Sequence, residues 1–217
     1  MKAIGVLFAL GTALQITGQS SAATPQVSIA CPAYAAPDTK CYSVRDDNGS
    51  FILTAIPASW NKNLVIFAHG GPRLEAPNAE TNIDEVRGVL PIATKLGYAF
   101  SAASYRRGGY ALQDSAEDTE NARKAFVEQF GQPTRTILYG NSYGAQVSQQ
   151  VMKRFVSSGN GPKTWDGVFI TSGALAPIIV QAQRIDLSSV YRYICKNLPG
   201  SSLFHVGSVS STPPAMR

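Results

Sequence analysis

A serine between two glycines stands in the stretch ILYGNSYGAQ, which joins an apolar run to a run compatible with a helix. Gly140, Ser142 and Gly144 fit the pattern GxSxG, in which a sharp strand-to-helix turn lifts a strained serine above a sheet. Glycine suits the positions two residues either side of the serine because a Cβ there would collide with the neighbouring strand and helix. The motif predicts that Ser142 is a nucleophile.

A second glycine motif ends another apolar run upstream, in the stretch LVIFAHGGP. The run 64–68 is continuously apolar, which is typical of a strand covered on both faces rather than one. It stops abruptly at His69, Gly70, Gly71 and Pro72. We therefore expect two loops with little steric bulk, each directly after a buried strand.

Strands and helices alternate from Leu64 to Gly173, which requires crossover connections and favours a parallel sheet. In such a sheet the functional loops gather at the carboxyl ends of the strands. The stretch CYSVRDDNGSFILTAI predicts an antiparallel hairpin that turns at Asn48 and Gly49. We expect an α/β protein with a mostly parallel, doubly wound sheet and an N-terminal antiparallel hairpin. The later strands are expected at 98–105, 136–140 and 167–173, and the helices at 82–96, where Pro91 kinks or divides the helix, 113–130 and 145–156.

The pairing of LVIFAHGGP with ILYGNSYGA, with SAASYRRGGY on the strand between them, resembles the α/β-hydrolase superfamily of serine esterases, lipases and peptidases. The resemblance covers about half of the chain. It implies that Ser142 accepts the acyl group and that the backbone amides of Tyr143, Gly70 and Gly71 form the oxyanion hole. It also implies that His69 supports its loop, since it precedes the serine, the wrong order for the general base.

The superfamily supplies its acid and base after the serine, in the order Ser, Asp or Glu, His. Here the residues that follow Ser142 include no Glu, two Asp (Asp166 and Asp186) and one His, His205. The sequence therefore permits Asp186 as a tentative acid and His205 as a tentative base. Asp186 opens a predicted helix, 186–198, where capping is the commoner role of an aspartate. Asp166 is expected to be a turn residue.

An alternative explains these weak candidates: the fold is incomplete at its C-terminus, and the strands that would carry the acid and base are absent. In this interpretation a lid insertion begins at about residue 174, and the chain is a truncated product or an inactive pseudoenzyme. The domain would then occupy 24–199, followed by an irregular tail, 200–217, that is rich in Ser, Gly and Pro.

Residues 1–23 have a basic start at Lys2, an apolar stretch and a small-residue end, which together predict a cleaved signal peptide. The apolar run is too interrupted for a membrane anchor, and no other candidate span follows. Export predicts a secreted or periplasmic protein and permits a disulfide between Cys31 and Cys41, which leaves Cys195 over.

Several other classes of function lack support in the sequence. The net charge is +5, but the basic residues form no run that would bind nucleic acid. No metal-ligand spacing or phosphate loop is present, so we expect no metal and no cofactor. RRGGY, 106–110, is expected to be a turn with exposed arginines or part of the substrate entrance. The sequence favours an exported hydrolase of small-molecule esters, with a serine peptidase of the same fold as the alternative.

Overall fold

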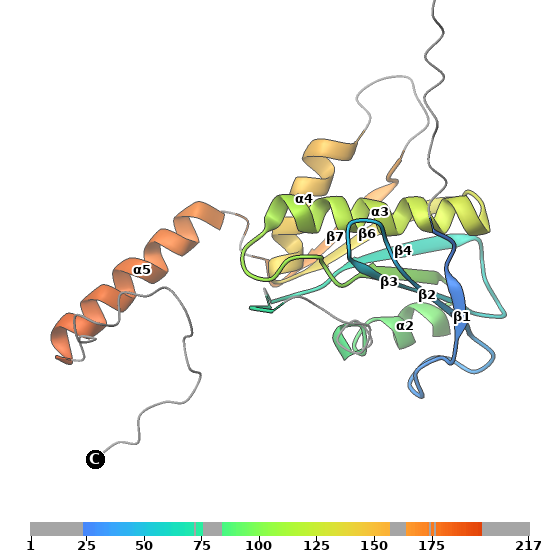
Figure 1. The fold of residues 1–217 in the computed structure, drawn as a ribbon, viewed down its shortest axis with the longest axis horizontal. Helices are drawn as coiled ribbons and strands as arrows, with labels where there is room; N and C mark the ends of the chain where they lie inside the picture. Colours follow the sequence, from blue (N-terminus) through green and yellow to red (C-terminus); the bar gives the residue numbers. More distant parts are fainter. Residues whose placement is uncertain are drawn as a thin grey trace, which may run out of the picture.

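Seven strands form one sheet among the residues that the computed structural model describes, which are 24–71, 73–75, 84–156, 164–173, 175 and 177–196. Across the sheet the strands follow the order β1-β2-β3-β5-β4-β6-β7 (Figure 1). Their bounds are β1 (Val27–Ile29), β2 (Lys40–Arg45), β3 (Phe51–Ile56), β4 (Asn63–Ala68), β5 (Ala99–Ala103), β6 (Arg135–Asn141) and β7 (Gly167–Thr171).

The sheet has a parallel half and an antiparallel half. β5, β4, β6 and β7 are parallel, as the alternation of strands and helices predicts. β2 and β3 form the predicted hairpin, and Gly49 in its turn has a φ of +90°. The antiparallel part is larger than a hairpin, because β1 pairs with β2 and β3 pairs antiparallel with β5. The predicted α/β fold class is confirmed, with a sheet that is mixed.

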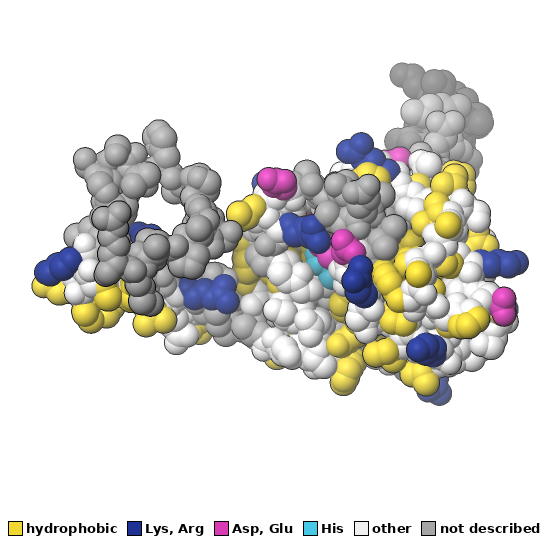
Figure 2. Space-filling model, turned by 90° about the horizontal axis from the view of Figure 1, so that it is seen from below, with side chains coloured by type: hydrophobic (Ala, Val, Ile, Leu, Met, Phe, Trp, Pro, Cys, Tyr) yellow, Lys and Arg dark blue, Asp and Glu magenta, His cyan; other side chains and the backbone are white. Residues whose placement is uncertain are grey.

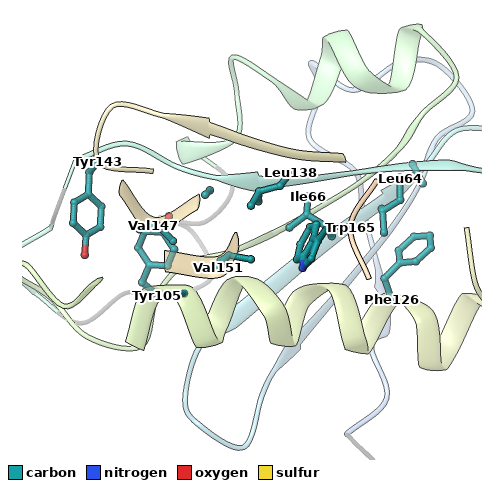
Figure 3. Packing of buried hydrophobic residues seen from close by; sticks show 12 residues of the cluster. Leu64, Ile66, Tyr105, Phe126, Leu138, Tyr143, Val147, Val151 and Trp165 are labelled. Atoms are coloured by element: carbon teal, nitrogen blue, oxygen red, sulfur yellow. The ribbon is translucent and has the colours of Figure 1, made fainter. Parts of the chain in front are cut away.

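Helices cover both faces of the sheet and explain why residues 64–68 of β4 are all apolar. α2 (Leu90–Lys95) lies on one face, and α3 (Leu112–Phe130) and α4 (Tyr143–Phe155) lie on the other (Figure 1). Ile66 packs in the cluster beneath α3 and α4, which Figure 3 shows, whereas its neighbour Phe67 packs in the cluster beneath α2. Successive side chains of a strand point to opposite faces, so a strand between two helical layers needs apolar residues at both.

At Pro91 the structure shows one of the two expected alternatives, whereas the last described helix begins earlier than expected. Pro91 lies in the first turn of α2, where proline needs no backbone partner, so it divides the predicted 82–96 tract instead of kinking it. The last described helix, α5 (Pro177–Ile194), begins well before Asp186. Asp186 is therefore an exposed residue of the helix interior, and its predicted capping role is wrong. The helix begins at a proline, which suits a first helical turn.

The predicted disulfide is confirmed. Cys31 and Cys41 are bonded, with their Cα atoms 5.1 Å apart, and join the segment after β1 to β2. Cys41 is buried in the α2-side core, and Cys195 is free and exposed. Within the described part of the chain, no helix combines the length and apolar character that crossing a bilayer requires. The predicted signal peptide, Pro72, His205 and the predicted tail lie outside the described residues.

Replacing Cys31 and Cys41 together by alanine is expected to lower the free energy of unfolding by about 2–3 kcal/mol, because the bridge closes a short loop in the unfolded chain. Denaturant unfolding of the oxidised protein measures the change. Cys195→Ala is the matched control, since that thiol is free and exposed, and it should change the free energy little. Equal effects of the two replacements would contradict the prediction.

Candidate active site

Ser142 occupies a strained turn between β6 and α4. Its φ is 52° and its ψ is −116°, a region that residues with a side chain rarely adopt. Its backbone N–H donates to the carbonyl of Thr171 at the end of β7 (3.0 Å), and its carbonyl accepts from Ala145 (3.0 Å). The side chain is exposed. The strand-to-helix turn that GxSxG predicts is therefore present, with the serine on the outside of the bend.

The two glycines of the motif are required by close contacts of the backbone. A Cβ on Gly144 would collide with the carbonyls of Ala68 and His69, where β4 ends. A Cβ on Gly140 would collide with the carbonyl of Gly144 and with the hydroxyl of Ser148. Their lack of side chains brings the first turn of α4 directly against the end of β4.

The turn after β4 lies beside Ser142, as the sequence predicts. A Cβ built on Gly70 would lie 3.2 Å from the Cβ of Ser142 and 3.2 Å from Oδ1 of Asn141. The next residue, Gly71, is exposed and has a φ of +65°. The structure thus brings together Ser142, Gly70 and Gly71 at the carboxyl edge, which we define as the edge of the sheet where β5, β4, β6 and β7 end.

Tyr143 is the first residue of α4. The backbone N–H groups of the first turn of a helix have no acceptor within the helix, and that of Tyr143 is one of them. Its side chain is buried, and its hydroxyl lies 3.2 Å from Oγ of Ser115 on α3. Its ring packs edge-on against Tyr110, with centroids 5.1 Å apart. These contacts fix the residue beside Ser142 and leave its amide at the carboxyl edge.

His69 is buried and committed to structural contacts. Its Nδ1 lies 2.9 Å from the carbonyl of Gly70, and its Nε2 lies 3.2 Å from Oε2 of Glu85. Its ring stacks on Tyr105 with centroids 4.0 Å apart. Burial lowers the pKa of His69 to about 4, so the ring is neutral at neutral pH. Both ring nitrogens face these partners, which leaves neither as a base for Ser142.

Glu85 shares the buried environment of His69. Burial raises the pKa of this carboxyl to about 7, although the nearby Arg73 lowers it. A carbonyl can only accept, so Nδ1 of His69 carries the proton that points at Gly70, and the neutral ring presents an acceptor at Nε2. Protonated Glu85 matches that acceptor. Below about pH 7 the proton of the pair therefore lies on Glu85.

The loop after β5 corrects the prediction for RRGGY. The side chain of Arg106 is 16% exposed and pairs with three carboxylates at the start of α3, those of Asp114, Glu117 and Asp118. Arg107, at 71%, is exposed as expected. The missed signal was the acidic stretch DSAEDTE, whose carboxylates recur at helical spacing.

The candidate acid and base are not assembled at the described site. All the residues from 182 to 196 are exposed, so no packing holds Asp186 beside Ser142. Asp166 accepts from the backbone of Thr136 (2.7 Å) near the start of β6, the opposite end of the strand from Ser142, and serves as the turn residue expected. His205 lies outside the described residues. No group of three His, Cys, Asp or Glu among the described residues could hold a metal.

Known structures share this fold. The chain is similar to an inhibited esterase B from Lactobacillus rhamnosis, at 16% identity and a TM-score of 0.52, with 72% of this chain and 57% of the esterase covered. A weaker match is a thermostable carboxyl esterase from Bacillus coagulans, at 16% identity and a TM-score of 0.48, with 74% of this chain and 52% of the esterase covered. Another is Candida antarctica lipase A, at 10% identity and a TM-score of 0.48, with 68% of this chain and 40% of the lipase covered.

The similarity to esterase B shows that the chain has the α/β-hydrolase fold, as the resemblance of the glycine motifs implied. The chain spans 57% of the length of that esterase. No protein-family model matches the sequence, and no curated protein is detectably similar to it in sequence.

Gly144→Ala is expected to lower the free energy of unfolding by about 3 kcal/mol or more, because the new methyl group meets backbone that cannot move aside. Gly71→Ala is the control: nothing lies within 4 Å of its added Cβ, and only the φ of +65° opposes it. That replacement should cost about 1–2 kcal/mol. Denaturant unfolding compares the two, and equal costs would show that α4 does not depend on this contact.

Glu85→Gln is expected to make the protein less stable towards acid than the wild type. A raised carboxyl pKa stabilises the folded state as the pH falls from about 7 to 4.5, whereas the lowered pKa of His69 destabilises it from 6.5 to about 4. The two effects offset each other in the wild type, and the variant keeps only the second. The stability difference between them should grow by about 2 kcal/mol from pH 7 to pH 5.

Unfolding in denaturant at the two pH values measures this difference. Asp84→Asn removes a neighbouring carboxylate that is 67% exposed, and it should show no comparable growth. A difference between Glu85→Gln and the wild type that stays constant or shrinks on acidification would contradict the assignment of the proton to Glu85.

Proposed function

We propose that this chain carries the nucleophile and the oxyanion donors of a serine hydrolase that cleaves carboxylic esters through an acyl-enzyme on Ser142. The observation that carries the proposal is the close approach of Gly70 to Ser142: a Cβ built on Gly70 would lie 3.2 Å from the Cβ of Ser142. Ser142 itself lies on an exposed and strained turn. The α/β-hydrolase fold, shared with an esterase, supports the same chemistry.

In this reaction the hydroxyl of Ser142 attacks the ester carbonyl carbon, and the carbonyl oxygen becomes an oxyanion. The amides of Tyr143 and of the Gly70–Gly71 turn donate hydrogen bonds to that oxyanion, and each donor can contribute about 3–4 kcal/mol. The intermediate then expels the alcohol and leaves the acyl group on Ser142, and water releases the acid in a second cycle.

The attack requires a base to accept the proton of Ser142. His205 is the candidate, because it is the one histidine that follows Ser142 in the sequence and the superfamily places its base there. The base would return that proton to the leaving alcohol. Asp186 is exposed on α5, so the proposal assigns it no part in holding the base.

The proposal extends to export. The disulfide between Cys31 and Cys41 supports it, because such bonds persist in oxidising compartments. The basic and apolar pattern of residues 1–23 points the same way. We propose a secreted or periplasmic protein.

A second candidate function is a non-catalytic product of the same fold. It is favoured by His69, the one histidine among the described residues: the ring is buried, its Nδ1 lies 2.9 Å from the carbonyl of Gly70 and its Nε2 lies 3.2 Å from Glu85. In that case Ser142 would have the geometry of a nucleophile without a base to activate it. A reactive-serine probe separates the two candidates.

A fluorophosphonate probe is expected to label the wild-type protein at Ser142, because the probe reacts with an activated serine whose oxyanion donors are in place. Ser142→Ala should abolish labelling, and His205→Gln should slow it by about 100-fold or more. Ser189→Ala, at an exposed serine of α5, should label at the wild-type rate. Peptide mapping identifies the labelled residue.

Hydrolysis of a short-chain nitrophenyl ester and of a peptide amide by the same preparation distinguishes an esterase from a peptidase. We expect turnover of the ester and not of the amide. A folded wild-type protein that neither reacts with the probe nor hydrolyses the ester would establish the non-catalytic candidate instead.

A further inference from the structure

One buried carboxyl group contacts the loop after β4 on both sides of its glycines. Oε2 of Glu85 lies 3.2 Å from Nε2 of His69, and Oε1 contacts Nε of Arg73. His69 directly precedes Gly70 and Gly71, and Arg73 follows them. The side chain of Glu85 is 8% exposed, and both of its oxygens are shielded from solvent. The contacts therefore join the two ends of the turn through one group.

Within the turn, the Gly70–Gly71 peptide is held by the hydrogen bond between Nδ1 of His69 and the carbonyl of Gly70 (2.9 Å), so its direction depends on where the His69 ring lies. Gly71 has a φ of +65°, and nothing lies within 4 Å of the position where its Cβ would be. Glycine has the widest choice of backbone conformations, so two in succession carry a large entropy in the absence of restraints. Donors to an oxyanion are effective only when their direction is fixed before the reaction. At Gly71 the added restraint comes from flanking residues such as His69, whose ring holds the Gly70–Gly71 peptide.

The flanking residues are held on their other sides by the loop after β5. The hydroxyl of Tyr105 donates to the carbonyl of His69 (3.2 Å), and its ring stacks on the imidazole. The backbone N–H of Gly109 donates to the carbonyl of Arg73 (2.5 Å). A Cβ on Gly108 would collide with the carbonyl of Leu74. The carbonyls are thus fixed by one loop, and the side chains by Glu85.

Figure 2 views the molecule from the α2 side and shows a small exposed area of histidine, with acidic and basic side chains beside it. Of the histidines, the described residues include His69, which is 2% exposed. The side chain of Arg73 is 42% exposed, more than that of its partner Glu85 at 8%. The carboxyl group of Glu85 is therefore enclosed between a ring and a guanidinium, which suits a residue that holds its neighbours in place rather than one that meets a substrate.

We propose that Glu85 is a positioning residue, which holds the amides of Gly70 and Gly71 towards Ser142 by restraining His69 before them and Arg73 after them. This inference rests on the proposed function of Ser142. Glu85 touches neither the substrate nor the reacting atoms, and its effect reaches them through the turn.

A replacement that keeps the hydrogen-bonding groups should preserve the restraint. In Glu85→Gln the side-chain amide offers an oxygen that can accept from Arg73 and an N–H that can donate to Nε2 of His69, the two contacts that a protonated Glu85 would make. Glu85→Ala removes both contacts and leaves the turn restrained from one side only. The two variants therefore separate the loss of the restraint from the loss of the charge.

The experiment measures the rate of fluorophosphonate labelling at pH 7, and kcat and KM for the nitrophenyl ester, in the full chain. Glu85→Ala is expected to lower the labelling rate and kcat by about 10- to 100-fold, with KM changed by less than about threefold, because the oxyanion donors are displaced. Glu85→Gln should restore both to within about threefold of the wild type. Asp84→Asn, at the exposed neighbouring carboxylate, should match the wild type.

The variant without the disulfide, Cys31→Ala with Cys41→Ala, controls for a general loss of stability, because it weakens a region away from Ser142. Equal slowing of this variant and of Glu85→Ala would overturn the inference, as would a wild-type rate for Glu85→Ala. Either result would leave the role of Ser142 intact. Absence of labelling in the folded wild type would instead overturn the proposed function, and the inference with it.

Discussion

The missing side chain of Gly144 is the constraint on which the site depends. At this position the first turn of α4 touches the carbonyls of Ala68 and His69, so the end of β4 and the start of α4 share one space. The same contact places Gly70 against Ser142 and sets the amide of Tyr143 beside the turn. A methyl group would separate the two motifs and move the candidate donors away from the serine. Packing of one backbone against another therefore decides the geometry of the candidate site.

The loops of the carboxyl edge are held by a chain of contacts, in which each loop is held by the one before it. Arg106 joins the loop after β5 to the carboxylates at the start of α3, and Gly109 in that loop donates to the carbonyl of Arg73. Tyr105 bonds the carbonyl of His69 and stacks on its ring. The start of α3 therefore holds the loop after β5, that loop holds the loop after β4, and the loop after β4 lies against Ser142. Charge at Arg106 serves the fold here, because carboxylates surround the guanidinium.

Patterns that are local in sequence were sufficient to predict the parallel half of the sheet, the β2–β3 hairpin and the turn at Ser142, but not β1 or the antiparallel pairing of β3 with β5. The run at β4, the glycines two residues either side of Ser142 and the hairpin turn at Gly49 each have a steric cause that can be read from neighbouring residues. Glu85 could not be found in this way, since its role depends on a contact with His69 that only the folded chain creates. The start of α5 could not be predicted from Asp186, because an aspartate within a helix has the same residue type as an N-terminal cap. The helix begins instead at the upstream proline, which suits a first helical turn.

Backbone strain is concentrated at the carboxyl edge, and this has a consequence for how the site is maintained. Each of the four parallel strands is followed within three residues by a residue with positive φ: Gly71 after β4, Tyr105 after β5, Ser142 after β6 and Ser172 after β7. Such conformations cost about 1–3 kcal/mol each for residues with a side chain, so surrounding contacts must hold them.

For Tyr105 those contacts are its stacking on the imidazole and its hydrogen bond to the carbonyl of His69. For Ser142 they are the hydrogen bond to Thr171 and the contact between Gly144 and β4. Gly71 avoids the strain because it has no side chain, but for the same reason it receives no support from packing. The turn that carries the proposed oxyanion donors thus has no side chain at Gly71 to fix it. A buried carboxyl group that holds the residues on both sides of that turn is the feature by which the fold supplies it.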